Sequence, residues 1–101
     1  MTIRFRRRAE VVERVVGTTV FLARDESGAL YRLNETGTAL WRLLAVPTSR
    51  VEAIAAFRAA FPDRSAREIG AAVTDLLEAL VEESLIEPCA TTSSRTGAER
   101  S

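Results

Sequence analysis

The side chains best suited to chemistry are few, and none of them forms a poised catalytic pair. The acidic pairs Asp25/Glu26 and Glu82/Glu83 are adjacent in sequence, so their carboxylates point apart and do not make an acid/base pair. The chain has no His, which removes imidazole bases, His-ligated metals and Ser-His or Cys-His pairs. A single Cys, Cys89, forms neither an internal disulfide nor a thiolate cage. We therefore expect no enzyme, no metal and no cofactor.

Size and composition limit the remaining classes of protein. With 101 residues, 47% of them hydrophobic, the chain makes at most one globular domain. A net charge of zero argues against a nucleic-acid partner. No apolar run reaches the roughly 18 residues that cross a bilayer, so we expect no membrane partner. The basic start, residues 1–8, lacks the apolar stretch of a signal peptide, and we expect a cytoplasmic protein.

The first half of the chain predicts three strands. Residues 11–16 are rich in Val and end at Gly17, residues 18–23 form a second run, and residues 29–33 a third, shorter one. Gly17 makes the bend between the first two strands, and the polar cluster 24–28 forms the next turn. Strands this close in sequence favour antiparallel pairing.

Three helices follow the strands. Asn34 suits the N-cap of a helix over 35–44, in which Trp41 is a core anchor and Gly37 allows close approach to the sheet. The capping boxes Ser49–Glu52 and Ser65–Glu68 each begin a further helix. The first of these ends before Pro62. The second carries a broad apolar stripe from Ile69 to Val81 over about five turns.

Charge and pattern divide the chain into three parts. We expect residues 1–9 to form a solvated basic arm, 10–87 the domain and 88–101 a disordered tail. Residues 66–87 hold one Arg and six acids, a net charge of −5. This acidic segment is either a solvated helix face or a surface that steers a basic partner.

The predicted order β-β-β-α-α-α is an α+β fold with a three-stranded antiparallel sheet covered by three helices. A sheet this small leaves at least one edge strand with unpaired backbone groups. Such an edge accepts an extended peptide as an added strand, and it also allows an edge-to-edge homodimer.

Residues 28–44 resemble the signature of the PqqD family, which is named for a pyrroloquinoline quinone biosynthesis protein and whose members are also called RiPP recognition elements. The shared pattern is a turn Gly, an aromatic strand and then L-N-x-x-G-x-x-x-W-x-x-L, here residues 33–44. The resemblance continues through the long helix to Ile86. This chain departs from it in two turns, at residues 45–47 and at Ser84, where members often carry glycine.

The resemblance implies a winged-helix-like fold that binds the leader segment of a ribosomally made precursor peptide. The leader would add beside the third strand, in the groove between that strand and the third helix. The domain would then present it to a modifying enzyme, such as a radical SAM protein, a cyclase or a leader peptidase. The expected peptide-binding residues are Leu30, Tyr31, Arg32, Leu33, Arg67, Ala71, Thr74, Asp75 and Glu78.

Two other classes of function compete with a non-catalytic adaptor. A winged-helix DNA-binding regulator would need a basic recognition helix. The helix with Arg50 and Arg58 is the one weak candidate for that role. The longest helix is acidic and would repel the phosphate backbone. The chain could also be a structural subunit of a larger complex.

Overall fold

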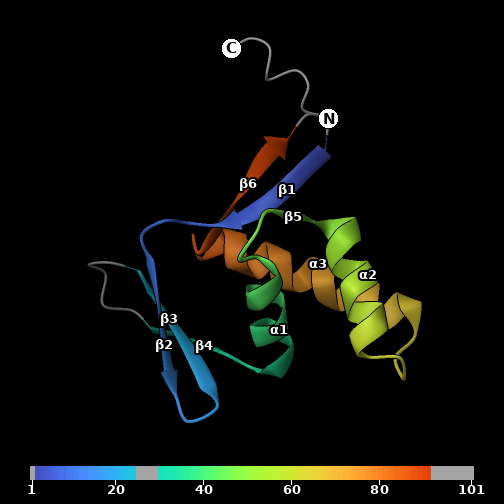
Figure 1. Cartoon of the computed structure of the whole chain (residues 1–101), viewed down its shortest axis with the longest axis horizontal. Helices are drawn as coiled ribbons and strands as arrows, with labels where there is room; N and C mark the ends of the chain where they lie inside the picture. The colour runs from blue at the N-terminus through green and yellow to red at the C-terminus, as the bar shows by residue number, and fades with distance from the viewer. Residues whose placement is uncertain (1, 25–29, 92–101) are drawn as a thin grey trace.

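The predicted domain begins with three strands and continues with three helices, and a two-residue strand lies between the first two helices. The computed structural model describes residues 2–24 and 30–91. It has two antiparallel sheets, with strand orders β5-β1-β6 (sheet A) and β2-β3-β4 (sheet B), and three helices, which confirms the α+β class (Figure 1). The elements are β1 Thr2–Arg7, β2 Val11–Val16, β3 Thr19–Arg24, β4 Leu30–Leu33, α1 Glu35–Leu43, β5 Thr48–Ser49, α2 Arg50–Ala60, α3 Ala66–Glu82 and β6 Ile86–Thr91.

Sheet B consists of the three predicted strands. Val16 pairs with Thr19 across a two-residue turn, and Gly17 in that turn has a φ of +65°, which confirms its predicted role. β3 then pairs with β4 in antiparallel register. The second predicted turn falls largely on residues 25–29, which lie outside the described residues.

The helices begin where the capping residues predict. The Asn34 side chain accepts a hydrogen bond from the Gly37 N–H at 2.8 Å. Both capping boxes are formed, at Ser49 and at Ser65. A Cβ on Gly37 would meet Asn34 Oδ1 at 3.2 Å and Leu33 Cδ2 at 3.4 Å, so the missing side chain does permit a close approach to the end of β4.

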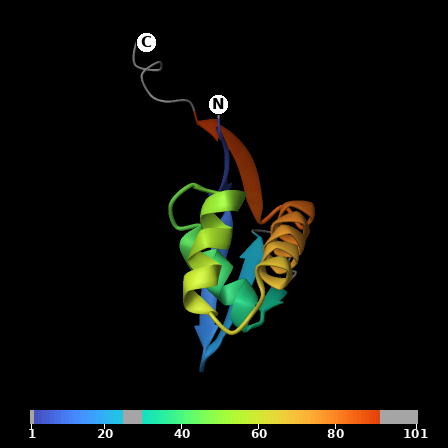
Figure 2. The same ribbon diagram turned by 90° about the vertical axis from the view of Figure 1, so that its right-hand side faces the viewer.

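The core lies between sheet B and the helices, which cover one side of the sheet (Figures 1 and 2). Val20, Leu22 and Leu33 from the sheet are buried there together with Leu77 and Leu80 of α3. Trp41 is the core anchor that the sequence predicts, at 2% exposure. Its Nε1 donates to Glu13 Oε1 at 3.1 Å, which satisfies the one polar atom of the buried ring.

The two ends of the domain differ from the prediction, because both contribute strands to sheet A. Residues 2–7, predicted as a solvated arm, form β1, and residues 88–91, predicted as the start of a disordered tail, belong to β6. These strands pair from Thr2 opposite Thr91 to Arg7 opposite Ile86 (Figure 1). Residues 92–101, the rest of the predicted tail, lie outside the described residues.

Ion pairs explain why a basic segment forms a strand. Arg6 Nε lies 2.8 Å from Glu87 Oε2, and Arg8 Nη1 lies 3.5 Å from the other oxygen of the same carboxylate. Phe5 packs against the core, while the Arg7 guanidinium stacks 4.3 Å from the Trp41 ring and donates to the Trp41 carbonyl. The arginine content concealed an alternating strand, in which Ile3, Phe5 and Arg7 share the face that lies toward the core.

Across residues 2–24 and 30–91, the helices are too short or too polar for any of them to cross a membrane.

Candidate functional site

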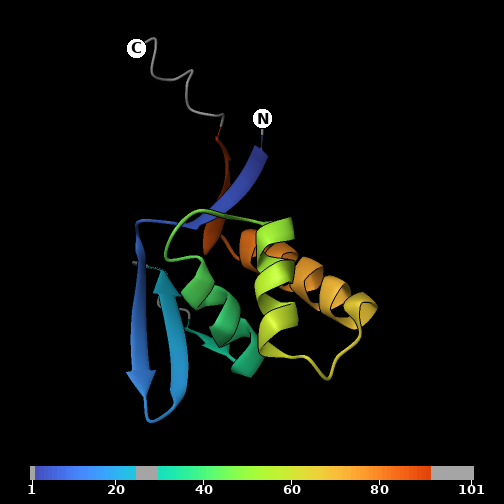
Figure 3. The same ribbon diagram turned by 45° about the vertical axis from the view of Figure 1, so that its right-hand side comes forward.

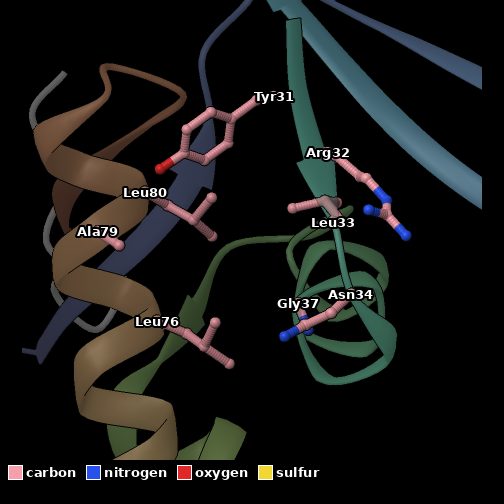
Figure 4. A pocket seen from close by; sticks show the side chains of 8 residues that line it. All are labelled: Tyr31, Arg32, Leu33, Asn34, Gly37, Leu76, Ala79 and Leu80. Atoms are coloured by element: carbon pink, nitrogen blue, oxygen red, sulfur yellow. The ribbon is translucent and has the colours of Figure 1, made fainter.

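The candidate site is the open edge of β4. Among the described strands β4 pairs only with β3, so its other side is a sheet edge. Asn34 follows β4 at once and caps α1, which fixes where this edge ends. Beyond the edge, α3 runs on the far side of a hollow (Figure 4).

The register assigns the backbone groups that face this edge. Residues flanking a two-residue hairpin turn form a hydrogen-bonded pair, and hydrogen-bonded pairs alternate along antiparallel strands. Val16 and Thr19 are such a pair, so the backbone N–H and C=O groups of Thr19 face β2 and those of Val20 and Leu22 face β4. Their partners Leu33 and Tyr31 therefore bond to β3. The N–H and C=O groups of Arg32 and Leu30 point to the open edge.

A groove of about 350 Å³ lies between β4 and α3. The side chains of Tyr31 and Leu33 point toward α3, and the side chain of Arg32 points away from it (Figure 4). From α3, Leu76 and Ala79 are half-buried and Leu80 is buried. The residues that line the groove are Tyr31, Arg32, Leu33, Asn34, Gly37, Leu76, Ala79 and Leu80. The groove thus offers the apolar side chains of Leu33, Leu76, Ala79 and Leu80 together with the ring of Tyr31, beside backbone groups that need partners.

One end of the groove is acidic. Burial raises the pKa of the Tyr31 hydroxyl above its ordinary value, and the carboxylates of Glu83 and Glu82 raise it further. α3 has no basic residue in its last turn, so its negative dipole end adds to these charges. A bound peptide would meet a negative field beside Tyr31.

The structure brings together only part of the residue set expected from the sequence. Tyr31, Arg32 and Leu33 line the groove, whereas Leu30 is exposed with its side chain on the opposite face of sheet B. Leu33 faces the core, and the half-buried Tyr31 shares its face.

The five residues expected on α3 do not line this groove. Arg67, Ala71 and Asp75 are exposed on the outer side of the helix. Thr74 and Glu78 line a different hollow of about 290 Å³, formed with Phe5, Arg50, Leu77 and Val81. Thr74 Oγ1 there accepts a hydrogen bond from Arg50 Nη1 at 3.1 Å.

Sequence reasoning missed Leu76 and Ala79 as groove residues. Leu76 falls within the apolar stripe predicted from Ile69 to Val81 and was taken to face the core with the rest of it. A helix turns about 100° per residue, so residues 72, 76, 79 and 83 share one flank of α3, and that flank faces β4. The signal was present in the spacing, but the sequence did not tell which flank of the stripe faces the sheet edge.

Within the described part of the chain, no three His, Cys, Asp or Glu side chains gather as metal ligands would.

Comparison with known proteins gives one match, to a protein family. Residues 19–86 match the family described as Coenzyme PQQ synthesis protein D (PqqD). This chain belongs to the PqqD family. The match runs from the first residue of β3 to the first residue of β6, so it contains β4, α3 and the whole groove. No curated protein and no solved structure matches the chain.

PqqD proteins are accessory proteins, and membership indicates an accessory, peptide-binding role associated with PQQ biosynthesis. The match begins after β1 and β2. The strand that pairs with β6, and one of the three strands of sheet B, therefore lie outside the matched segment. The DNA-binding alternative gains no support, because one of its two helix arginines, Arg50, is bonded to Thr74.

Proposed function

We propose that this protein is a cytoplasmic, non-catalytic adaptor that binds the leader segment of a ribosomally made precursor peptide as an added strand on β4. The observation that carries the proposal is the open edge of β4 beside an apolar groove. An added strand gains main-chain hydrogen bonds from the edge, and the groove selects its side chains. The adaptor would then present the peptide to a modifying enzyme.

The groove defines the peptide that fits. Alternate residues of an added strand point to the same face, so side chains two apart would enter the groove. There they would contact Tyr31, Leu33 and Leu76, which favours apolar side chains. A basic residue fits beside Tyr31, where Glu82 and Glu83 make the field negative. The leader is therefore apolar at alternate positions with a Lys or Arg at one end.

Fluorescence polarisation with labelled leader peptides tests this proposal. The peptides come from short open reading frames beside the gene for this chain, and a scrambled leader is the control. Saturable binding that the scrambled peptide lacks is the expected result. Absence of binding to every neighbouring leader would contradict the proposal.

Two α3 variants test whether the groove is the site. Leu76→Arg places a charged side chain in the groove and should weaken leader binding about tenfold or more. Asp75→Arg adds the same side chain one residue away, on the exposed side of α3, and should change the affinity by about twofold at most. Equal effects of the two variants would argue against the groove.

The open edge also admits a second copy of the chain as an edge-to-edge dimer. If β4 is the shared surface, leader binding and dimer formation exclude each other. Sedimentation at rising leader concentration would then show conversion of dimer to a peptide-bound monomer. A dimer that binds leader without dissociating would show that it forms elsewhere.

A further inference from the structure

Sheet B has a second face that the helices approach only at one end, where Thr19 and Arg32 line a hollow with residues of α1. The hairpin of β2 and β3 stands at one side of the molecule, with all three helices on its other side (Figure 3). Strand pairing and alternation define the residues of this outer face, which are Val12, Arg14, Val16, Thr19, Phe21, Ala23, Leu30 and Arg32.

The outer face is more apolar than a solvated sheet face should be. An antiparallel sheet with one wet face normally alternates apolar residues inward with polar residues outward. Here Val12, Val16 and Leu30 are 49%, 65% and 61% exposed, and half-buried Phe21 lies in the central strand. A contiguous apolar surface of this kind on a small domain marks an interaction site.

Two arginines flank the centre of the outer face. Arg14 on β2 and Arg32 on β4 both pair in register with Phe21 on β3. Both are exposed, and neither has an ion pair within residues 2–24 and 30–91, unlike the β1 arginine Arg6, which is paired with Glu87. The eight residues of the face include no acid, and Glu35 of α1 lines a hollow with Arg32 and with a further arginine, Arg42. The surface is therefore apolar at its centre with two unneutralised guanidinium groups beside it.

This charge pattern selects the kind of partner. A guanidinium group matches a carboxylate in a planar, two-bond geometry. A second copy docking through the same face about a two-fold axis would oppose arginines to arginines, because this face has no acid of its own. The apolar centre offers nothing to a phosphate backbone. The complementary surface is a protein patch with an apolar centre and carboxylates around it.

We propose that the outer face of sheet B docks the enzyme that modifies the bound peptide, through an apolar patch on that enzyme rimmed by carboxylates. The proposal rests on the proposed function, because it takes the partner from it. β4 connects the two surfaces. Leu30 and Arg32 project from its outer face while Tyr31 and Leu33 project into the groove. The enzyme would dock against the reverse side of the strand that holds its substrate.

Charge reversal on β2 tests the docking face without touching β4. The partner is the purified modifying enzyme encoded beside the gene for this chain, and its affinity is measured by biolayer interferometry with and without leader. Arg14→Glu, which reverses the charge, should weaken enzyme binding about tenfold. Arg14→Gln, which only removes the charge, should weaken it less. Leader affinity should stay within about twofold, because Arg14 lies two strands from the open edge. The control Arg58→Glu makes the same charge change on exposed α2 and should leave both affinities unchanged.

The outcomes separate this proposal from the proposed function. Equal enzyme affinity for the wild type and both Arg14 variants, or no enzyme binding at all, would overturn the docking face while leader binding stands. Arg14→Glu could instead abolish binding of the protein to phosphatidylserine vesicles, or abolish a dimer of the protein, and leave enzyme binding unchanged. This result would overturn the docking proposal in favour of a lipid surface or a second copy. Failure of the wild type to bind any leader would contradict the proposed function instead.

Discussion

Ser84 is the one non-glycine residue with a positive φ among residues 2–24 and 30–91. It follows the C-cap of α3 and has a φ of +61°, a left-handed conformation that favours glycine. The Ser84 N–H bonds to the Val81 carbonyl at 2.9 Å and the Leu85 N–H to the Leu80 carbonyl at 2.9 Å. These two bonds form the Schellman arrangement that turns the chain from α3 into β6.

Ser84→Gly should therefore stabilise the protein. Removal of the Cβ relieves the left-handed strain, and part of that gain is offset by the greater freedom of glycine in the unfolded chain. We expect a gain of about 0.5–1 kcal/mol, or about 4 °C in Tm. Thermal unfolding measures it, with Ser84→Ala as the control that should show no gain. A lower Tm for the glycine variant would contradict this account of the turn.

Glu52 ties β1 to the start of α2. Arg4 Nε donates to Glu52 Oε1 at 3.1 Å and Arg4 Nη2 to Oε2 at 2.9 Å, while the Ser49 N–H donates to Oε1 at 2.9 Å. The hydrogen bonds from Arg4, and then that from Ser49, lower the pKa of Glu52 from 4.5 to about 2.

This shift makes the contribution of Glu52 depend on pH. A carboxyl whose pKa is depressed by folding stabilises the protein above its unfolded pKa, and this stabilisation disappears as the pH falls through the folded pKa. Glu52→Gln should thus lower Tm above pH 4.5, with a difference from the wild type that vanishes near pH 2. Tm measured from pH 2 to 6 tests this, with exposed Glu78→Gln as the control. A difference independent of pH would refute the ionic origin.

At the scale of elements, β1 is anchored by Arg7. Its guanidinium stacks on Trp41 at 4.3 Å, and its Nε donates to the Trp41 carbonyl at 3.1 Å, near the C-terminal end of α1. Arg7→Ala should cost about 1–2 kcal/mol of unfolding free energy. Arg14→Ala, which removes an exposed arginine, should cost under about 0.5 kcal/mol. Urea unfolding followed by the fluorescence of Trp41, the one tryptophan, compares them. Equal costs would restore the view of residues 1–9 as a solvated arm.

The open edge of β4 can be tested separately from its side chains. Proline removes a backbone N–H and is tolerated on the outer side of an edge strand. Arg32→Pro should therefore keep the β3–β4 pairing but weaken leader binding about tenfold beyond any effect of Arg32→Ala. Polarisation titrations of the two variants give this ratio. A ratio near one, with both variants folded, would place the leader elsewhere.

Most elements could be predicted because their signals are local. Asn34, Gly17 and the two capping boxes act within a few residues, and the structure confirms each of them. Sheet A could not be predicted, because its strands pair residues about 80 positions apart, as in Arg6 opposite Glu87. The flank of α3 that faces β4 depends on that same long-range packing. This is why Leu76 and Ala79 were missed while Tyr31 and Leu33 were found.

For the whole molecule, one short strand connects two surfaces of opposite character. The groove between β4 and α3 is apolar with acidic residues at one end, whereas the outer face of sheet B is apolar with two arginines. Alternation along β4 sends neighbouring side chains to the two surfaces. A peptide on the edge and an enzyme on the outer face would then be held a single sheet thickness apart, which suits an adaptor that presents a substrate without reacting with it.

Amide hydrogen exchange at β4 tests the central claim most directly. In the free protein the amides of Leu30 and Arg32 face the open edge and should exchange fast, whereas those of Tyr31 and Leu33 are bonded to β3 and should exchange slowly. Saturation with leader should slow exchange at Leu30 and Arg32 and leave Tyr31 and Leu33 slow. Leader binding with unchanged, fast exchange at Arg32 would contradict strand addition to β4.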